Sequence, residues 1–221
     1  MPHVPLFASE EFRGRERGLY GDVVEEVDWG VGQVQETLTD EELDENTFVV
    51  FTSDNGPWVV MDQPGGSAGL FFGAKATSYE GGVREPAIFW MPGTVKPGVI
   101  SKMGGTLDLL PTISNMAGTS LPEDRLYNAY DLTPVLTGED AGPRKELIYY
   151  HGTRVFAARI GAYEAVYYSN NPQVCPGNMQ KLDKPRLFNL SVDPSERFDL
   201  AEEHPGEIKI PLRDTCRHEK D

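Results

Sequence analysis

Residues 48–58 read FVVFTSDNGPW, an apolar run that passes directly into a carboxylate and an amide. Phe48–Phe51 favour a β-strand, and their lack of alternation indicates burial on both faces, as in a parallel sheet between helices. In open α/β sheets ligands bind beyond the carboxyl ends of the strands, which is where Asp54 and Asn55 fall. Together they offer two hard oxygen ligands suited to Ca²⁺ or Mg²⁺. The alternative is an Asn-Gly turn that joins this strand to a second strand at 58–61.

A long glycine-rich stretch follows, from Asn55 to the proline at 86, and it contains a single lysine. Loops longer than about 12–15 residues inside a compact domain are usually functional. Lys75 has only small, uncharged neighbours, so an anion can approach its ammonium group closely. The alternative is a solvated lysine on a surface loop. We expect the charges of Glu80, Arg84 and Glu85 to pair among themselves and to fix this loop.

The chain has four histidines, and His3, in the stretch PHVPLF, is the candidate for chemistry. A histidine beside a reacting oxyanion can donate a hydrogen bond or protonate a leaving group near neutral pH. The alternative is an exposed bystander at the start of the chain. His151 follows an apolar strand and is expected to be structural, whereas His204 and His218 lie in a polar tail and carry no functional signal.

Composition narrows the classes of function. The 221 residues carry a formal charge of −15 and no basic run, which disfavours nucleic acids and anionic membranes as partners. No apolar run reaches the roughly 18–20 residues of a membrane span, and the first twenty residues do not read as a signal peptide. The two cysteines, Cys175 and Cys216, could form one disulfide or remain two free thiols, and the sequence does not decide between these. Asn189 begins a three-residue glycosylation sequon, a match that often occurs by chance.

Periodicity predicts an α/β architecture with a β-rich C-terminal annex. Apolar residues at three- and four-residue steps predict an amphipathic helix from Phe12 to Leu38. PAIFWMPG predicts a short strand closed by a turn. TLDLLPTISNMAG predicts a helix that Thr106 caps and Gly118 ends. From residue 147 onward, short aromatic segments predict a small antiparallel sheet.

Several of these stretches, taken together and in this order, resemble a known family. They are PHVPLFAS, FTSDNGP, AKATSYEGGVREPAIFWMPG, LDLLPTI and LFNLSVDPSERFDL. They look like the second half of a sulfatase of the arylsulfatase type, in the arylsulfatase A and N-acetylgalactosamine-6-sulfatase group. The resemblance implies part of an alkaline-phosphatase-like mixed sheet flanked by helices over residues 1–140. It also implies a small antiparallel C-terminal subdomain over residues 141–221.

The resemblance also implies roles for the candidate residues. Asp54 and Asn55 match the second pair of Ca²⁺ ligands of the family, and Asp54 is implied to help deprotonate the nucleophile. Lys75 matches the lysine that contacts the sulfate group. His3 matches the histidine that contacts sulfate and protonates the leaving alcohol. A divalent cation with two cationic side chains would offset charge on the sulfuryl oxygens, although the protein as a whole is acidic.

Two departures from the family pattern concern the chemistry. The family nucleophile is a cysteine converted to formylglycine in a Cys-x-Pro-Ser-Arg-like motif, and neither Cys175 nor Cys216 lies in such a motif. The first pair of metal ligands, two adjacent aspartates, has no counterpart in this sequence. Because the chain begins abruptly at His3, we expect that the segment carrying both is missing. The chain alone is then expected to position sulfate without the covalent step, and to be marginally stable.

The sequence therefore predicts part of a calcium-dependent sulfuric ester hydrolase that acts on an aryl sulfate or a sulfated glycan. Two alternatives stay open, namely a phosphoester or phosphonate hydrolase of the same superfamily and a non-catalytic protein that binds sulfated ligands. The resemblance implies a lysosomal or secreted protein, and the sequence leaves homo-oligomerisation open.

Overall fold

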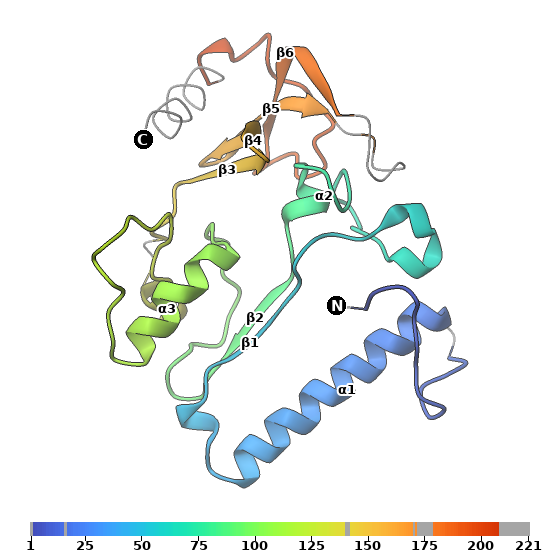
Figure 1. Cartoon of the computed structure of the whole chain (residues 1–221), viewed down its shortest axis with the longest axis vertical. Coiled ribbons are helices and arrows are strands. Elements are labelled where there is room, and N and C mark those ends of the chain that lie inside the picture. Colours follow the sequence, from blue (N-terminus) through green and yellow to red (C-terminus); the bar gives the residue numbers. More distant parts are fainter. Residues whose placement is uncertain (1, 16, 140–141, 170, 172–178, 208–221) are drawn as a thin grey trace. The chain divides into compact units, whose positions relative to one another are not determined.

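Figure 1 shows a computed structural model of the chain. The chain consists of two compact units. The described residues are 2–15, 17–139, 142–169, 171 and 179–207. The pairing of Cys175 and Cys216 lies outside them. Unit 1 comprises Met1–Thr37, Phe51–Ala87 and Ile148–Asp221, and unit 2 comprises Leu38–Val50 and Ile88–Leu147. The boundary after residue 140 that the sequence suggests stays a prediction.

The predicted N-terminal helix is present as α1, Gly18–Asp40. It begins six residues later than periodicity suggests, because Gly14 and Gly18 adopt positive φ angles of 82° and 69° that interrupt a helix. The buried Asp22 then fixes the entry to the helix, since its carboxylate accepts hydrogen bonds from the backbone N–H groups of Gly14 (2.9 Å) and Arg15 (3.2 Å).

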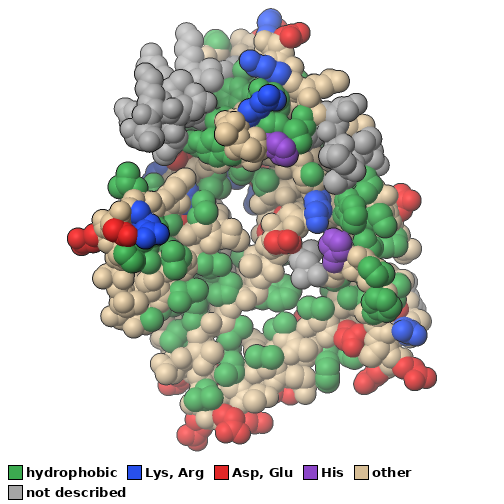
Figure 2. Space-filling view, viewed as in Figure 1, with side chains coloured by type: hydrophobic (Ala, Val, Ile, Leu, Met, Phe, Trp, Pro, Cys, Tyr) green, Lys and Arg blue, Asp and Glu red, His purple; other side chains and the backbone are tan. Residues whose placement is uncertain are grey.

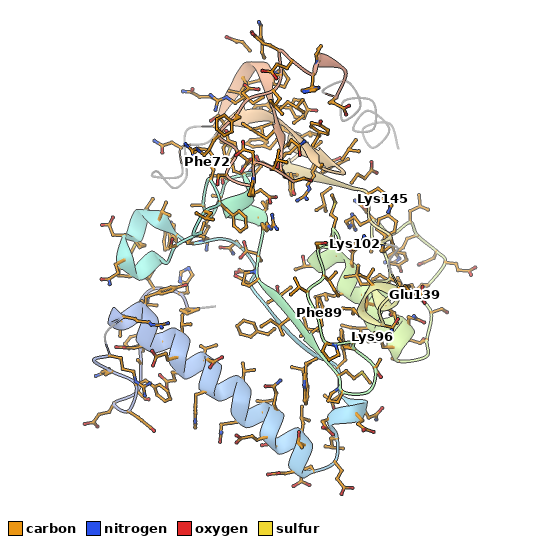
Figure 3. The ribbon with its side chains drawn as sticks, turned by 180° about the vertical axis from the view of Figure 1, so that it is seen from behind. Phe72, Phe89, Lys96, Lys102, Glu139 and Lys145 are labelled. Carbon is orange, nitrogen blue, oxygen red and sulfur yellow. The ribbon has the colours of Figure 1, made fainter. Side chains whose placement is uncertain are left out.

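The predicted strand at 48–51 is present as β1, Val49–Thr52, and it pairs with β2, Ala87–Trp90, in a two-stranded sheet. The rings of Phe48 and Phe89 stack with centroids 5.9 Å apart (Figure 3 labels Phe89). The expectation that this strand is buried on both faces is wrong for the described part of the chain. All four residues of β1 are half-buried, because β2 is its single strand partner there.

The predicted C-terminal antiparallel sheet is confirmed, with four strands in the order β3-β4-β5-β6. The strands are β3 (Glu146–His151), β4 (Arg154–Ile160), β5 (Tyr163–Ser169) and β6 (Gln180–Asn189). β4–β5 and β5–β6 pair antiparallel, with Ala158 opposite Ala165 and Ala165 opposite Leu187. These three side chains are almost fully buried and belong to a buried apolar cluster on one face of this sheet.

Short helices connect the strands. They are the 3₁₀ helices η1 (Asp44–Asn46), η2 (Val59–Met61), η3 (Gln63–Gly65) and η4 (Thr106–Asp108), and the α-helices α2 (Glu80–Val83), α3 (Leu109–Met116) and α4 (Thr133–Leu136). The helix predicted at 106–118 is therefore η4 followed by α3. The expected cap by Thr106 is wrong, because the Asp108 carboxylate accepts the Gly105 N–H at 2.9 Å and closes this turn instead. None of the helices within the described residues is long and apolar enough to cross a membrane.

A buried ion pair holds unit 2 together. Asp108, with no exposed surface, accepts two hydrogen bonds from the Arg144 guanidinium, whose side chain is 1% exposed. The same carboxylate accepts the Tyr130 N–H at 2.8 Å, and the guanidinium donates to the Asn128 carbonyl at 3.1 Å. Figure 3 shows further charged side chains of unit 2, labelled Lys96, Lys102, Glu139 and Lys145, around α3. The pair joins the end of η4, just before α3, to the segment that leads into β3.

Large apolar side chains lie exposed over much of the face that Figure 2 shows. On α1, the exposed fraction is 53% for Trp29 and 54% for Val34, and Leu19 and Val24 of the same helix are exposed as well. Exposed apolar surface of this extent favours association or low stability in an isolated chain.

We predict that Arg144→Met lowers the free energy of unfolding by about 3–5 kcal/mol, because it leaves the Asp108 carboxylate buried without its partner. Urea denaturation of the two proteins measures this difference. Arg125→Met is the matched control, since Arg125 and Asp124 form an ion pair in which both side chains are exposed, and it should leave stability unchanged. Equal losses in the two variants would contradict the assignment of the Arg144 pair as the support of unit 2.

Candidate functional site

The predicted ligand pair, Asp54 and Asn55, lies where the backbone leaves β1. Asp54 is exposed and Asn55 is half-buried, so a small cation can reach both side chains. The hydroxyl of the buried Ser53 donates to the Asn55 carbonyl oxygen at 2.9 Å and fixes this bend. Because β1 pairs with β2 and residues 59–61 form η2, the hairpin alternative for this Asn-Gly sequence is wrong.

A close approach of backbone to backbone joins this bend to α2. The Gly56 N–H donates to the Gly82 carbonyl at 3.2 Å, and a Cβ on Gly56 would lie 2.0 Å from the Gly81 carbonyl oxygen. The next residue, Pro57, accepts the Lys75 N–H at 2.9 Å. There is no room for a side chain at position 56, so glycine is required there. The contact brings the segment of Asp54 beside the segment of Lys75.

His3 and Lys75 meet at Trp58, a residue that the sequence analysis did not assign to the site. The imidazole of His3 lies 5.5 Å from the indole of Trp58, measured between ring centroids. The Lys75 ammonium lies 5.6 Å from the same ring centroid, within the range of a cation–π contact. The expected partners His3 and Lys75 are thus brought together by one aromatic side chain. The signal in the sequence was an aromatic residue three positions after Asn55.

The expected pairing of charges around α2 is confirmed in part. Arg84 donates to Glu80 at 2.8 Å, as predicted. Glu85 does not join them. Its carboxyl lies by Ser53 and Asp54. Burial raises the pKa of Glu85, hydrogen bonding with the Ser53 side chain lowers it, and the Asp54 charge raises it. The pairing failed because Glu85 is drawn toward the end of β1, while Glu80 turns into the core.

The donor chemistry at the end of β1 fits a hard cation. The carboxyl groups of Asp54 and Glu85 lie close enough to interact, and Asn55 follows Asp54 directly in the chain. In the described part of the chain, the buried Oε1 of Glu85 has no hydrogen-bond partner. Among the described residues, no three His, Cys, Asp or Glu side chains form a complete metal site. The residues present therefore fit part of the coordination shell of a divalent cation.

The other histidines and the Asn189 sequon lie in local packing and turn contacts. His151 packs against Phe156 with ring centroids 5.2 Å apart, which agrees with its expected structural role. His204 lies 6.1 Å from the ring of Tyr163. The side-chain oxygen of Asn189 accepts the Ser191 N–H at 3.1 Å, which forms a local turn at the sequon. His218 lies outside the described part of the chain.

Comparison with known proteins identifies the family. A family model described as Sulfatase matches residues 1–119, more than half of the chain, and one described as the C-terminal region of aryl-sulfatase matches residues 142–215. The chain belongs to the sulfatase family. The resemblance drawn from the sequence motifs is confirmed.

Individual relatives agree with this assignment. N-acetylgalactosamine-6-sulfatase from dog (Canis lupus familiaris) is 37% identical over 221 aligned positions, and human arylsulfatase A is 37% identical over 214. Each match covers 90% of this chain but 42% of the relative. The crystal structure of the PsFucS1 sulfatase from Pseudoalteromonas sp. superposes with a TM-score of 0.89 over 98% of this chain and 46% of that chain, at 23% identity. The predicted alkaline-phosphatase-like fold class is confirmed, and the chain spans less than half the length of these sulfatases.

We predict that Gly56→Ala disturbs the candidate site, because its methyl group would overlap the Gly81 carbonyl. The free energy of unfolding should fall by about 1–3 kcal/mol, as for other overpacked positions. Gly30→Ala is the matched control: Gly30 lies inside α1, and outside the adjacent backbone of this helix no described atom lies within 4 Å of the added methyl group, so stability should rise by up to about 1 kcal/mol. Thermal denaturation of both variants checks the opposite signs, and a neutral Gly56→Ala would contradict the close approach.

Proposed function

We propose that this chain forms part of a sulfuric ester hydrolase. In this proposal Asp54 and Asn55 hold a divalent cation, Ca²⁺ or Mg²⁺, while Lys75 and His3 bind the sulfate group. The observation that carries it is the meeting of Lys75 and His3 at Trp58, beside the segment of Asp54 and Asn55, in a chain of the sulfatase family.

Each side chain contributes a separate part of the reaction. The Lys75 ammonium and the His3 imidazole offset negative charge that develops on the sulfuryl oxygens. His3 then protonates the alcohol as it leaves, and Asp54 accepts a proton from the nucleophile. Trp58 lies against both side chains and holds them on the same part of the loop. The cation, when bound, polarises the S–O bonds and lowers the charge that the other groups must offset.

The nucleophile is assigned to no residue of this sequence. In the sulfatase family this role is expected to fall to a formylglycine derived from cysteine, and the two cysteines stand in other sequence contexts. The proposal therefore separates binding from chemistry. Residues 1–140, taken as the C-terminal part of the catalytic domain, supply cation and sulfate binding, and residues 141–221 form a subdomain that supports them.

The substrate class is proposed as a sulfate ester of an aryl compound or of a sugar within a glycan. The names of the relatives, arylsulfatase A and N-acetylgalactosamine-6-sulfatase, support these two classes. A lysosomal or secreted location belongs to the same proposal, and homo-oligomerisation stays a prediction. A non-catalytic protein that binds sulfated ligands is the second candidate, favoured by the lack of a matching cysteine motif in this sequence.

Hydrolysis by the protein purified from its natural source separates these functions. We predict release of nitrophenol from 4-nitrophenyl sulfate, slower release from 4-nitrophenyl phosphate, and loss of activity after removal of divalent cations with EDTA that added calcium restores. Faster turnover of the phosphate ester would favour a phosphoester hydrolase. Tight binding of the sulfate ester without turnover would favour the non-catalytic candidate.

For the 221-residue chain itself, we predict that Lys75→Ala weakens binding of 4-nitrophenyl sulfate at least about tenfold, the value of one charge-assisted hydrogen bond. Isothermal titration in the presence of calcium measures this affinity. Lys184→Ala is the control. Lys184 is exposed on β6, so this substitution removes the same charge from the protein at a position outside the site. Equal weakening in both variants would show that general charge, and not the site, governs binding.

A further inference from the structure

Three glutamates from distant parts of the sequence are buried together in unit 1. We call Glu80 of α2, Glu164 of β5 and Glu196, which follows β6, the carboxyl cluster. Their exposed fractions are 1%, 0% and 6%. Glutamate is rarely buried so completely unless it is paired, so the partners of each carboxyl group decide what the cluster does.

Glu80 has a full set of partners and is the centre of the cluster. One carboxylate oxygen accepts from Arg84 at 2.8 Å and the other from Arg159 at 3.1 Å. Its backbone N–H donates to a Glu196 oxygen at 2.8 Å. Glu196 reaches this position with a φ angle of 50°, a conformation that residues with a Cβ adopt rarely. The start of α2 is thus fixed from β4 and from the segment after β6.

Glu164 and Glu196 lack the partners that a charged carboxylate requires. Within the described residues, both oxygens of Glu164 and Oε1 of Glu196 have no hydrogen-bond partner. Arg159 lies opposite Glu164 in the register of β4 and β5, but its guanidinium donates to Glu80 and to the Gly161 carbonyl. Three carboxyl groups therefore share two guanidinium groups, of which that of Arg84 is half exposed. A negative charge that is buried without a partner costs free energy, and the cluster avoids this cost when it binds a proton.

The charges that face these two carboxyl groups favour protonation. Burial, followed by the charges of Glu196 and Glu80, raises the pKa of Glu164 well above its usual range, and Arg159 opposes this. Burial also raises the pKa of Glu196 to about 8. The hydrogen bond from the Glu80 backbone N–H lowers this pKa, the negative charges of Glu80 and Asp193 raise it, and the positive charge of Arg159 lowers it. The remaining neighbour, the Tyr149 phenol of β3, has a pKa raised by burial and by Glu164, so it stays neutral.

The sign of the pH dependence follows from these raised pKa values. A carboxyl group whose pKa is higher in the folded protein binds its proton more tightly there, so folding is favoured at low pH. This contribution is fully present below the ordinary glutamate pKa of about 4.3 and is lost as pH rises toward about 8.

A short path of contacts connects the carboxyl cluster to Lys75. Glu80 is the first residue of α2, and the next N–H, of Gly81, donates to the Phe72 carbonyl at 2.6 Å. Gly82 accepts the Gly56 N–H, and Pro57 accepts the Lys75 N–H. Displacement of α2 would therefore move the two backbone segments that carry Lys75 and Asn55.

We propose that Glu80 is a positioning residue for the sulfate site and that a proton shared within the carboxyl cluster holds it in place. This inference rests on the proposed function, because the segments that it positions are those of the sulfate and cation ligands. The site is accordingly assembled in acidic solution and loosens as pH rises, so the cluster makes the Lys75 segment sensitive to pH without itself contacting the substrate.

Hydrogen exchange of the 221-residue chain, read by mass spectrometry and corrected for intrinsic rates, tests the proposal. Between about pH 5 and about pH 9, protection of the amides at 75–83 should fall as pH rises toward about 8 and level off above it, while amides within α1 keep theirs. The double variant Glu164→Gln with Glu196→Gln replaces both carboxyl groups by neutral groups of the same shape, so protection at 75–83 should no longer depend on pH. Glu202→Gln, at an exposed glutamate beyond β6, is the control and should behave as the wild type.

The outcomes separate this inference from the proposed function. Protection at 75–83 that is independent of pH in the wild type, or that falls equally in the double variant, would overturn the inference. If the double variant does not fold, urea unfolding of the wild type decides, since the unfolding constant should rise about tenfold per pH unit for each proton held by the cluster. Addition of calcium and 4-nitrophenyl sulfate at low pH should increase protection at 75–83. If protection at 75–83 depends on pH but does not change when these ligands are added, the result would contradict the proposed function and leave the inference about the cluster standing.

Discussion

The contact between Gly56 and the Gly81–Gly82 pair is the constraint on which the candidate site depends. It places the bend after β1 against α2 with no space for a Cβ atom, so the segments of Asn55 and Lys75 lie side by side although twenty residues separate them. Neither segment has regular structure that would hold it alone. The site is therefore built by backbone hydrogen bonds between loops, with α2 as the common support.

Electrostatics explains how an acidic chain can bind an anion. The formal charge of −15 would repel a sulfate ester, and the site opposes this with two basic side chains gathered at Trp58. The negative charges nearby are divided between two places. Asp54 and Glu85 lie at the end of β1, where their oxygens suit a cation, and the glutamates behind α2 are buried away from solvent. Among the described residues, neither Lys75 nor His3 forms an ion pair with an acidic side chain.

The sequence predicted the elements that depend on local pattern and on family motifs. The amphipathic helix α1, the strand β1 and the aromatic C-terminal strands follow from periodicity, and the motif around Asp54, Lys75 and Arg84 led to the sulfatase family, which the comparisons confirm. Such signals are local, so they persist even where the chain spans less than half of its relatives.

What the sequence could not predict depends on contacts between distant residues. Trp58 joins the site because the chain after Gly56 curls through η2 and η3, which no periodicity indicates. Glu164 is the one charged residue of β5, and its burial follows from contacts of the strand with other elements that the local sequence does not show. β1 reads as a strand buried on both faces, and its half-exposure reflects the strand partners it has among the described residues.

The central claim is that Asp54, Asn55, Lys75 and His3 form one site for a sulfate ester, and chemical modification of Lys75 tests it most directly. The rate of acetylation of Lys75 is measured by mass spectrometry relative to that of the exposed Lys184, with and without calcium and 4-nitrophenyl sulfate. The account predicts that the two ligands together slow acetylation of Lys75 selectively, and that Asp54→Asn removes the effect of calcium. Equal rates for both lysines under all conditions would contradict it.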